Sequence, residues 1–186
     1  MYKRQEDGIW GYRDFFTVPE DAQPVTMGEG NTPLIHTGRL GAFYGMKNLY
    51  LKNETLNPSG TYKDRFATVA MTLAKEDGIK QVAIGSAGNA AAAVAAYAAK
   101  ADMECFIMLP PGAVKERAWQ NMAYGGHFIY GLGGVNDCVK MAEDGEAIFG
   151  WKNMCTTMMN NPLACDGYKT IAYEAARSMK FEAPDY

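Results

Sequence analysis

The sequence is poor in the features that mark several large classes of protein. Charged residues make up 21% of the 186 residues and the net charge is only −3, so the chain has no basic face for nucleic acid. Its apolar runs are interrupted well short of the length that crosses a membrane. No basic start is followed by an apolar segment, so we expect no signal peptide. We therefore expect a cytoplasmic globular protein that binds neither nucleic acid nor membrane.

Cysteine and histidine are few, and their spacing argues against a zinc site. No two cysteines form a CxxC pair, and the two histidines lie far apart in the sequence. The simplest interpretation is a set of reduced thiols in a cytoplasmic protein with no bound metal. The residues concerned are Cys105, Cys138, Cys155, Cys165, His36 and His127.

What the sequence does contain is a predicted strand, turn and helix around one lysine. The strand is expected at 48–53, and apolar residues recur at helical spacing between Phe66 and Ala74. Between them, Asn-Pro and Ser-Gly pairs break regular structure, and Ser59 or Thr61 is the expected N-cap of the helix. The turn reads Asn57-Pro58-Ser59-Gly60-Thr61-Tyr62-Lys63-Asp64-Arg65.

Lys63 is therefore expected in the first turn of this helix. The helix dipole is positive at that end, which disfavours an ammonium and favours the neutral amine that Schiff-base chemistry requires. The alternative is a solvated lysine paired with Asp64, and this stretch taken alone favours that alternative.

A second stretch predicts an anion site. The short apolar run Val82–Ile84 leads into the small residues Gly85-Ser86-Ala87-Gly88-Asn89, and an alanine-rich helix is expected over 90–101. Backbone N–H groups of such a loop at the start of a helix bind anions readily. The alternative for Asn89 is a simple N-cap, and the two roles are compatible.

The middle of the chain alternates short apolar runs with helical stretches. Strands are expected to begin near Val82, Glu104 and His127, with helices over 90–101, 114–124 and 135–149. This alternation is typical of parallel strands covered by helices on both faces, so residues 81–149 are predicted to form a small open α/β domain. Further helices are expected over 39–44 and 166–179, while residues 1–30 look irregular, anchored by Trp10, Tyr12, Phe15 and Phe16.

Taken together, these motifs resemble pyridoxal-phosphate enzymes of the tryptophan-synthase-β type (fold type II), and among them threonine synthase. The resemblance rests on the order and spacing of Gly28-Glu29-Gly30-Asn31-Thr32-Pro33-Leu34, Lys52-Asn53-Glu54, the turn at 57–65 and the loop at 86–89. It implies an α/β fold with open parallel sheets flanked by helices. It also implies a small domain at 81–149 and an incomplete large domain formed by 1–80 and 150–186.

The resemblance assigns roles to the two loops. Lys63 would bind pyridoxal 5′-phosphate covalently and move protons at the substrate, and Asn89 would hydrogen-bond the cofactor's ring hydroxyl. The loop and the start of its helix would hold the substrate carboxylate, and Asp64 and Arg65 would be structural. A homodimer acting on a small amino acid, O-phosphohomoserine in threonine synthase, is implied. The carboxylate-binding residues would be Ser86, Ala87, Gly88, Asn89 and Ala90.

Two departures from the pattern leave the substrate open. Threonine synthases carry an arginine shortly after an Asn-Pro pair, and here Ala164 stands near that place. Ala90 replaces the threonine or serine often found after the loop asparagine. Losing a bidentate phosphate ligand weakens phosphate recognition, so a dehydratase or another β-eliminating or β-replacing enzyme is an alternative. The family's glycine-rich phosphate loop and its partner for the pyridine nitrogen have no counterpart here, so we expect an N-terminal part of a longer enzyme, inactive alone.

Two alternatives belong to other functional classes. Gly131-Leu132-Gly133-Gly134 follows a predicted strand, but it lacks the GxGxxG spacing and the later acidic residue of a dinucleotide site. A non-catalytic α/β binding module is the other alternative. This alternative predicts a stable chain that does not bind pyridoxal phosphate.

Overall fold

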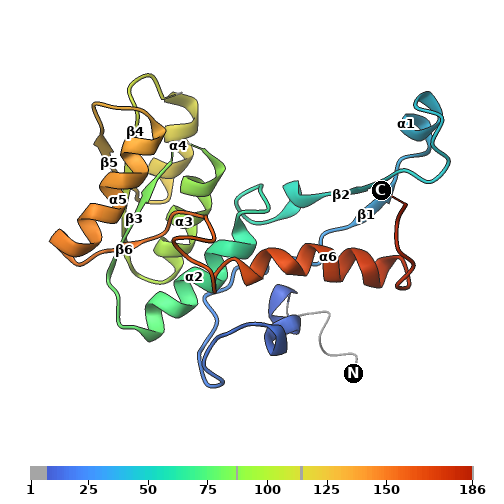
Figure 1. Ribbon diagram of the computed structural model, residues 1–186, viewed down its shortest axis with the longest axis horizontal. Coiled ribbons are helices and arrows are strands. Elements are labelled where there is room, and N and C mark those ends of the chain that lie inside the picture. Colours follow the sequence, from blue (N-terminus) through green and yellow to red (C-terminus); the bar gives the residue numbers. More distant parts are fainter. Residues whose placement is uncertain (1–7, 87, 114, 186) are drawn as a thin grey trace.

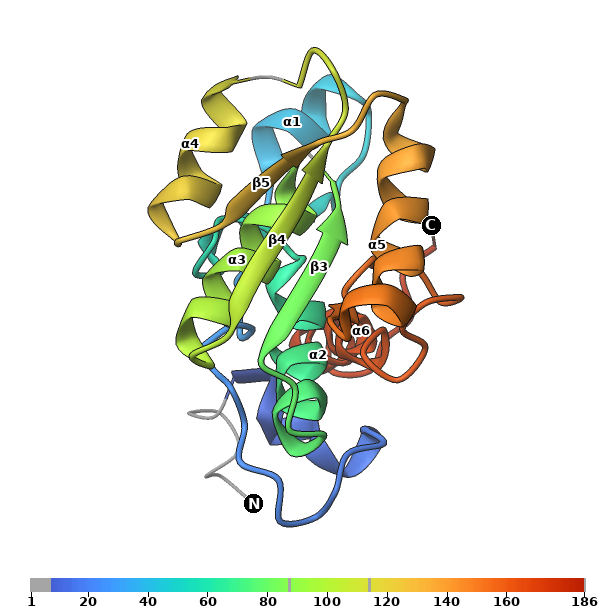
Figure 2. The same ribbon diagram turned by 90° about the vertical axis from the view of Figure 1, so that its left-hand side faces the viewer.

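A computed structural model describes residues 8–86, 88–113 and 115–185, with side chains omitted for 115–117. The chain forms a body around a four-stranded parallel sheet and a two-stranded arm that extends from it (Figures 1 and 2). None of the helices in these segments combines the length and the apolar character needed to span a membrane. The predicted α/β class is confirmed.

The sheet contains all three predicted strands and one that the sequence did not reveal. Its order is β5-β4-β3-β6 and all neighbours are parallel. The strands are β3 (Gln81–Gly85), β4 (Glu104–Leu109), β5 (His127–Tyr130) and β6 (Lys152–Asn153). The short β6 pairs with β3 through Val82↔Lys152 and Ala83↔Asn153, so the sheet extends beyond residue 149.

Helices cover both faces of this sheet, as predicted. The connections β3–α3–β4–α4–β5 run in one direction, and the return through α5 to β6 runs in the other, so right-handed crossovers place α5 on the opposite face (Figure 1). The bounds are α3 (Asn89–Lys100), α4 (Lys115–Ala123) and α5 (Val135–Phe149). Alanines between 91 and 98 are buried, and their small side chains let α3 lie close to α2 and to the sheet.

Two further helices carry the lysine turn and support it. The helix α2 (Asp64–Glu76) follows the turn and packs against both α3 and α6 (Asp166–Ser178). At Gly167 an added Cβ would lie 1.9 Å from the carbonyl oxygen of Arg65. The first turn of α6 therefore rests directly on the backbone of α2, and no larger residue fits there without moving one helix.

The N-terminal region is more regular than predicted. Residues Gly8–Phe15 form the 3-10 helix η2. Trp10 and Phe16 are buried with their rings edge to face, and Trp10 Nε1 donates to Thr68 Oγ1 of α2 at 2.8 Å. Phe15 is 58% exposed, although its ring contacts that of Tyr173 in the C-terminal helix at 5.2 Å between centroids.

The arm consists of residues 34–52. Its strands β1 (Leu34–His36) and β2 (Tyr50–Lys52) pair antiparallel, and the short helix α1 (Gly38–Phe43) lies at its tip (Figure 1). Lys52 ties the arm to the body, because its Nζ donates to Glu174 of α6 at 2.6 Å. Ile35 and Leu51 pair across the strands and remain 42% and 50% exposed.

Candidate active site

Lys63 stands at the N-cap position of α2, one residue before the first turn. The prediction that Ser59 or Thr61 caps this helix is wrong. Ser59 instead donates both its backbone N–H, at 2.7 Å, and its hydroxyl to the carboxylate of Asp64. Thr61 Oγ1 accepts the N–H of Lys63 at 3.3 Å, so this hydroxyl closes the turn that precedes the helix.

The amine of Lys63 contacts a hydroxyl and two aromatic rings. Its Nζ donates to Thr156 Oγ1 at 3.2 Å and lies 4.7 Å and 5.1 Å from the ring centroids of Tyr62 and Tyr168. We call Tyr62, Tyr168 and Thr156 the lysine cage. The alternative of a lysine paired with Asp64 is not what the structure shows, since the buried Asp64 carboxylate is held by Ser59.

The lysine cage lies at the carboxyl edge of the sheet. Thr156 follows β6, and the backbone there stays against β3 because Met154 N donates to Ala83 O at 2.7 Å. Ser86 follows the end of β3. Ligands of open α/β sheets bind beyond the carboxyl ends of strands, at the point where successive connections leave in opposite directions. Here that point lies between β3 and β6, so the contact with Thr156 places the Lys63 amine at the edge of the sheet where the family of open α/β folds binds ligands.

Helix α3 begins at Asn89, one residue earlier than predicted. Gly88 is the N-cap residue in extended backbone, and its N–H donates to Ser86 Oγ at 3.3 Å. The expectation that Asn89 caps the helix is therefore wrong: Asn89 is the first helical residue, and its side chain is exposed. Ala90 lies partly buried in the first turn, and Ala87 lies outside the described residues. The first N–H groups of α3 have no acceptors within the helix, as an anion site requires.

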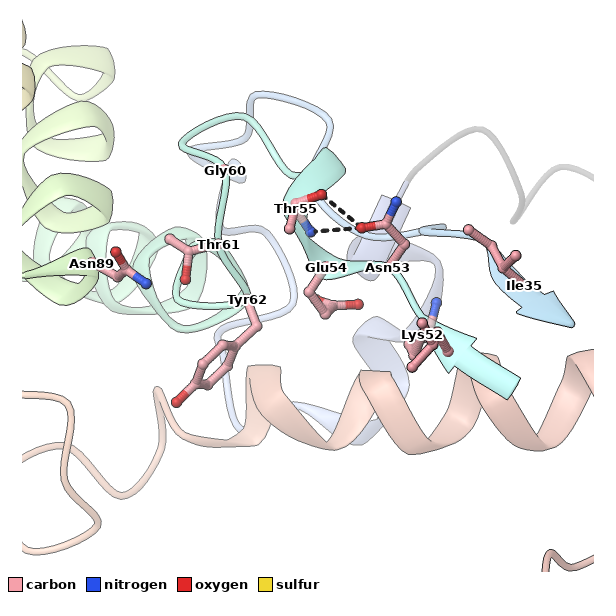
Figure 3. Close-up of a pocket in the computed structure, with 10 residues that line it drawn as sticks. Ile35, Lys52, Asn53, Glu54, Thr55, Gly60, Thr61, Tyr62 and Asn89 are labelled. Carbon is pink, nitrogen blue, oxygen red and sulfur yellow. Dashed lines mark hydrogen bonds between the residues drawn. The ribbon is translucent and has the colours of Figure 1, made fainter. Parts of the chain in front are cut away.

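A cavity of about 500 Å³ joins the lysine turn, the start of α3 and the arm. Figure 3 shows Asn89 reaching toward Thr61 from α3, with Tyr62 on the turn and Ile35 and Lys52 on the arm. Tyr62 both lines this cavity and contacts the Lys63 amine. The volume is within the usual range for a small-molecule site. The cavity is lined by Ile35, Leu51, Lys52, Asn53, Glu54, Thr55, Gly60, Thr61, Tyr62 and Asn89.

Residues 25–186 match the family described as pyridoxal-phosphate dependent enzyme. This chain belongs to that family. It is 35% identical over 186 residues to threonine synthase of Methanocaldococcus jannaschii, covering 98% of this chain and 45% of the relative. It is 37% identical to threonine synthase of Mycobacterium leprae, covering 89% and 46%. The chain thus spans about half the length of the curated relatives that it matches.

The solved structures agree on the fold of this family member. Diaminopropionate ammonia lyase of Escherichia coli superposes with a TM-score of 0.73 at 21% identity, over 83% of this chain and 49% of that one. At this identity the likeness concerns the fold alone. It confirms the parallel sheet flanked by helices that the resemblance implied.

Arg65, next to the candidate cofactor lysine of this family member, is the centre of a buried ionic cluster. Its guanidinium is fully buried and binds Glu54 and Glu174 through both carboxylates, with N–O distances of 2.7–2.9 Å. Burial raises the pKa values of both carboxyls, but the hydrogen bonds and charge of Arg65, with further hydrogen bonds from Thr32 to Glu54 and from Lys52 to Glu174, together hold each pKa below its ordinary value. The cluster is completed by Thr32, Thr170 and Lys52.

The glycine-rich motif at 28–34 is tied to the same cluster. Gly30 N donates to Asn57 Oδ1 and Asn31 N donates to Glu174 Oε1, both at 2.9 Å. Glu29 is fully buried and accepts the Tyr97 hydroxyl of α3 at 2.6 Å. In this chain the motif therefore joins the arm, the lysine turn, α3 and α6 into one unit.

Asp64 should give the protein a measurable pH dependence. Burial raises its pKa from 3.8 to about 6, although hydrogen bonds from Ser59 oppose the shift; charges on Glu29 and Glu54 add to it. A raised folded-state pKa means that the folded protein binds this proton more tightly than the unfolded chain. Its contribution to stability is complete below about pH 4 and falls by about 3 kcal/mol as the pH rises past 6.

The variant Asp64→Asn isolates this effect. We expect the unfolding free energy of the native protein, measured by urea denaturation relative to the variant, to fall by about 3 kcal/mol between pH 4 and pH 7. Glu54 and Glu174 titrate in both proteins and cancel in the difference. A difference that stays constant with pH would contradict the shifted pKa of Asp64.

Proposed function

We propose that this chain provides the lysine-bearing part of a pyridoxal-phosphate-dependent lyase of the threonine-synthase type. The observation that carries the proposal is the position of the Lys63 amine, which contacts Thr156 just beyond β6 while the Ser86 loop follows the adjacent β3. Supporting it are the family match over residues 25–186 and the identity to threonine synthases.

Lys63 and Asn89 offer two of the groups that pyridoxal phosphate needs, while the family's glycine-rich phosphate loop has no counterpart in this chain. Lys63 supplies the amine for covalent attachment, and Asn89, which lines the cavity, supplies an amide for a ring hydroxyl. When bound, pyridoxal phosphate supplies an electron sink for bonds at the substrate's α carbon. Lys63 then holds and moves a proton at the α and β carbons of the substrate. The N–H groups and side chains of residues 86–90 bind the substrate carboxylate.

The substrate is proposed to be a small amino acid. O-phosphohomoserine is the first candidate, because the curated relatives named above are threonine synthases. A second candidate class is an amino acid without a phosphate, converted by β-elimination or β-replacement. It is favoured by Ala164, a buried apolar residue near the place where the resemblance calls for a phosphate-binding arginine.

We further propose that the complete enzyme has a small domain built on residues 81–149. We infer that it is a cytoplasmic homodimer that binds no nucleic acid. The four cysteines are free and buried, which fits a reducing compartment.

The proposal is tested by labelling with the cofactor. The chain is incubated with pyridoxal phosphate, reduced with borohydride and digested, and the modified peptides are mapped by mass spectrometry. We expect the label to saturate on Lys63 at a cofactor concentration that leaves exposed lysines such as Lys140 and Lys169 largely unmodified. A label spread over the exposed lysines, with no preference for Lys63, would favour the non-catalytic binding module.

A further inference from the structure

The lysine cage brings together residues from three distant parts of the chain. Tyr62 precedes the lysine, Thr156 follows β6 and Tyr168 lies in the first turn of α6. The two tyrosine rings are 5.4 Å apart, and Tyr168 also stacks on Phe66 of α2 at 5.9 Å. The rings of Tyr62 and Phe66 therefore hold the ring of Tyr168 from two sides.

The cage attracts the amine by two kinds of interaction. A cation within about 6 Å of an aromatic centroid is attracted to the face of the ring, and both centroid distances are shorter than that. The Thr156 hydroxyl accepts a hydrogen bond from Nζ and so adds a direction to this attraction. A lysine side chain has high rotamer entropy when it is free, so several contacts are needed to keep it in one place.

We propose that Tyr168 and Thr156 are positioning residues that hold the Lys63 amine at the carboxyl edge of the sheet, beside the Ser86 loop. Tyr62 completes the cage and also lines the cavity, so this one side chain contacts both the held amine and the cavity. The functional meaning of this arrangement rests on the proposed role of Lys63, but the arrangement itself can be tested without any cofactor.

The test uses reductive methylation of the whole chain with ¹³C-formaldehyde and cyanoborohydride. Peptide mapping gives the labelling rate of Lys63 relative to exposed Lys140, and NMR gives the shift of the Lys63 methyl signal. In the native chain we expect slower labelling of Lys63 and a methyl signal displaced upfield by the two rings. Tyr168→Leu should speed Lys63 labelling about fivefold, the factor equivalent to roughly 1 kcal/mol of lost cation–π attraction, and reduce the displacement.

Conservative variants separate positioning from general structural support. Tyr168→Phe keeps the ring and should keep both the slow labelling and the displaced signal. Thr156→Val removes only the hydroxyl and should speed labelling twofold to fivefold, while Thr156→Ser should restore the native rate. Thr156 lies in a loop, so its substitutions should leave the helices and strands intact. The Thr156→Val and Thr156→Ser variants therefore test the proposal even if Tyr168→Leu does not fold.

The outcomes are distinct from those of the cofactor experiment. The proposal is overturned if Lys63 and Lys140 label equally fast in the native chain, or if the leucine and phenylalanine variants behave alike. If the amine is held as described but pyridoxal phosphate labels other lysines, the proposed function fails and the lysine cage stands. If the cofactor labels Lys63 and the amine is not held, the proposal on the lysine cage fails and the proposed function stands.

Discussion

Replacing Lys63 with alanine is expected to abolish the specific pyridoxyl label on this chain. The amine of Lys63 contacts Thr156 at the carboxyl edge of the sheet, where the Ser86 loop also begins. Lys52, which lines the cavity, has its amine bound by Glu174 and Thr32 at 2.5–2.6 Å and is not free to react. Loss of one side chain should therefore remove the whole signal rather than redistribute it.

The measurement is the stoichiometry of borohydride-fixed label in the native chain and in the variant. Lys169→Ala is the matched control, because this lysine is exposed, belongs to the helix that carries Tyr168, and pairs only with its neighbour Asp166 among the contacts described. The control should retain the full label. An unchanged stoichiometry in Lys63→Ala would show that another amine carries the cofactor.

Replacing Arg65 with methionine is expected to lower the free energy of unfolding by about 3–5 kcal/mol. The variant keeps most of the buried volume but leaves Glu54 and Glu174 without the guanidinium that binds both. Removing one partner of a buried ion pair costs more than the pair itself contributes, because the remaining charge is left unpaired. Urea denaturation at pH 7 measures the loss.

The pH response of this variant separates lost charge pairing from lost packing. In the native protein the pKa values of Glu54 and Glu174 are lowered, so their contribution to stability is lost as the pH falls. Without Arg65, Glu174 keeps Lys52 and the Asn31 N–H, and Glu54 keeps hydrogen bonds from Thr32 and Asn57. Burial then meets less opposition and both pKa values rise relative to the native protein, so the variant should lose less stability than the native protein as the pH falls from 7 toward 5. Arg39→Met, at an exposed position in α1, should change stability by less than about 0.5 kcal/mol. A methionine variant that loses stability on acidification as the native protein does would contradict the charge argument.

The sequence predicted the periodic elements well, because each of them depends on local pattern. The helix over 135–149 has the predicted bounds, and the strands near Val82, Glu104 and His127 are all present. The helix starts were predicted less well. Both Lys63 and Gly88 occupy N-cap positions without side-chain capping bonds, so the usual capping residues gave the wrong boundary.

The lysine cage could not be predicted, because it depends on contacts between distant segments. The two-residue strand β6 has no apolar run or alternation that would reveal it, yet it places Thr156 beside the lysine. Tyr168 lies in another helix, and no local pattern links it to Lys63. Likewise, Arg65 was expected to be structural, but nothing local pointed to Glu174 as its partner.

The place of β6 in the sheet also has a consequence for the order of folding events. Strands β3, β4 and β5 pair with their neighbours in sequence, whereas β6 joins β3 only after the chain has passed through two strands and three helices. Closing a loop of that length costs entropy before any contact repays it, which makes such pairings slow. The Thr156 hydroxyl therefore reaches the Lys63 amine only when one of the last contacts of the sheet forms. A newly made chain would contain the lysine turn and most of the sheet before it could hold the amine in place.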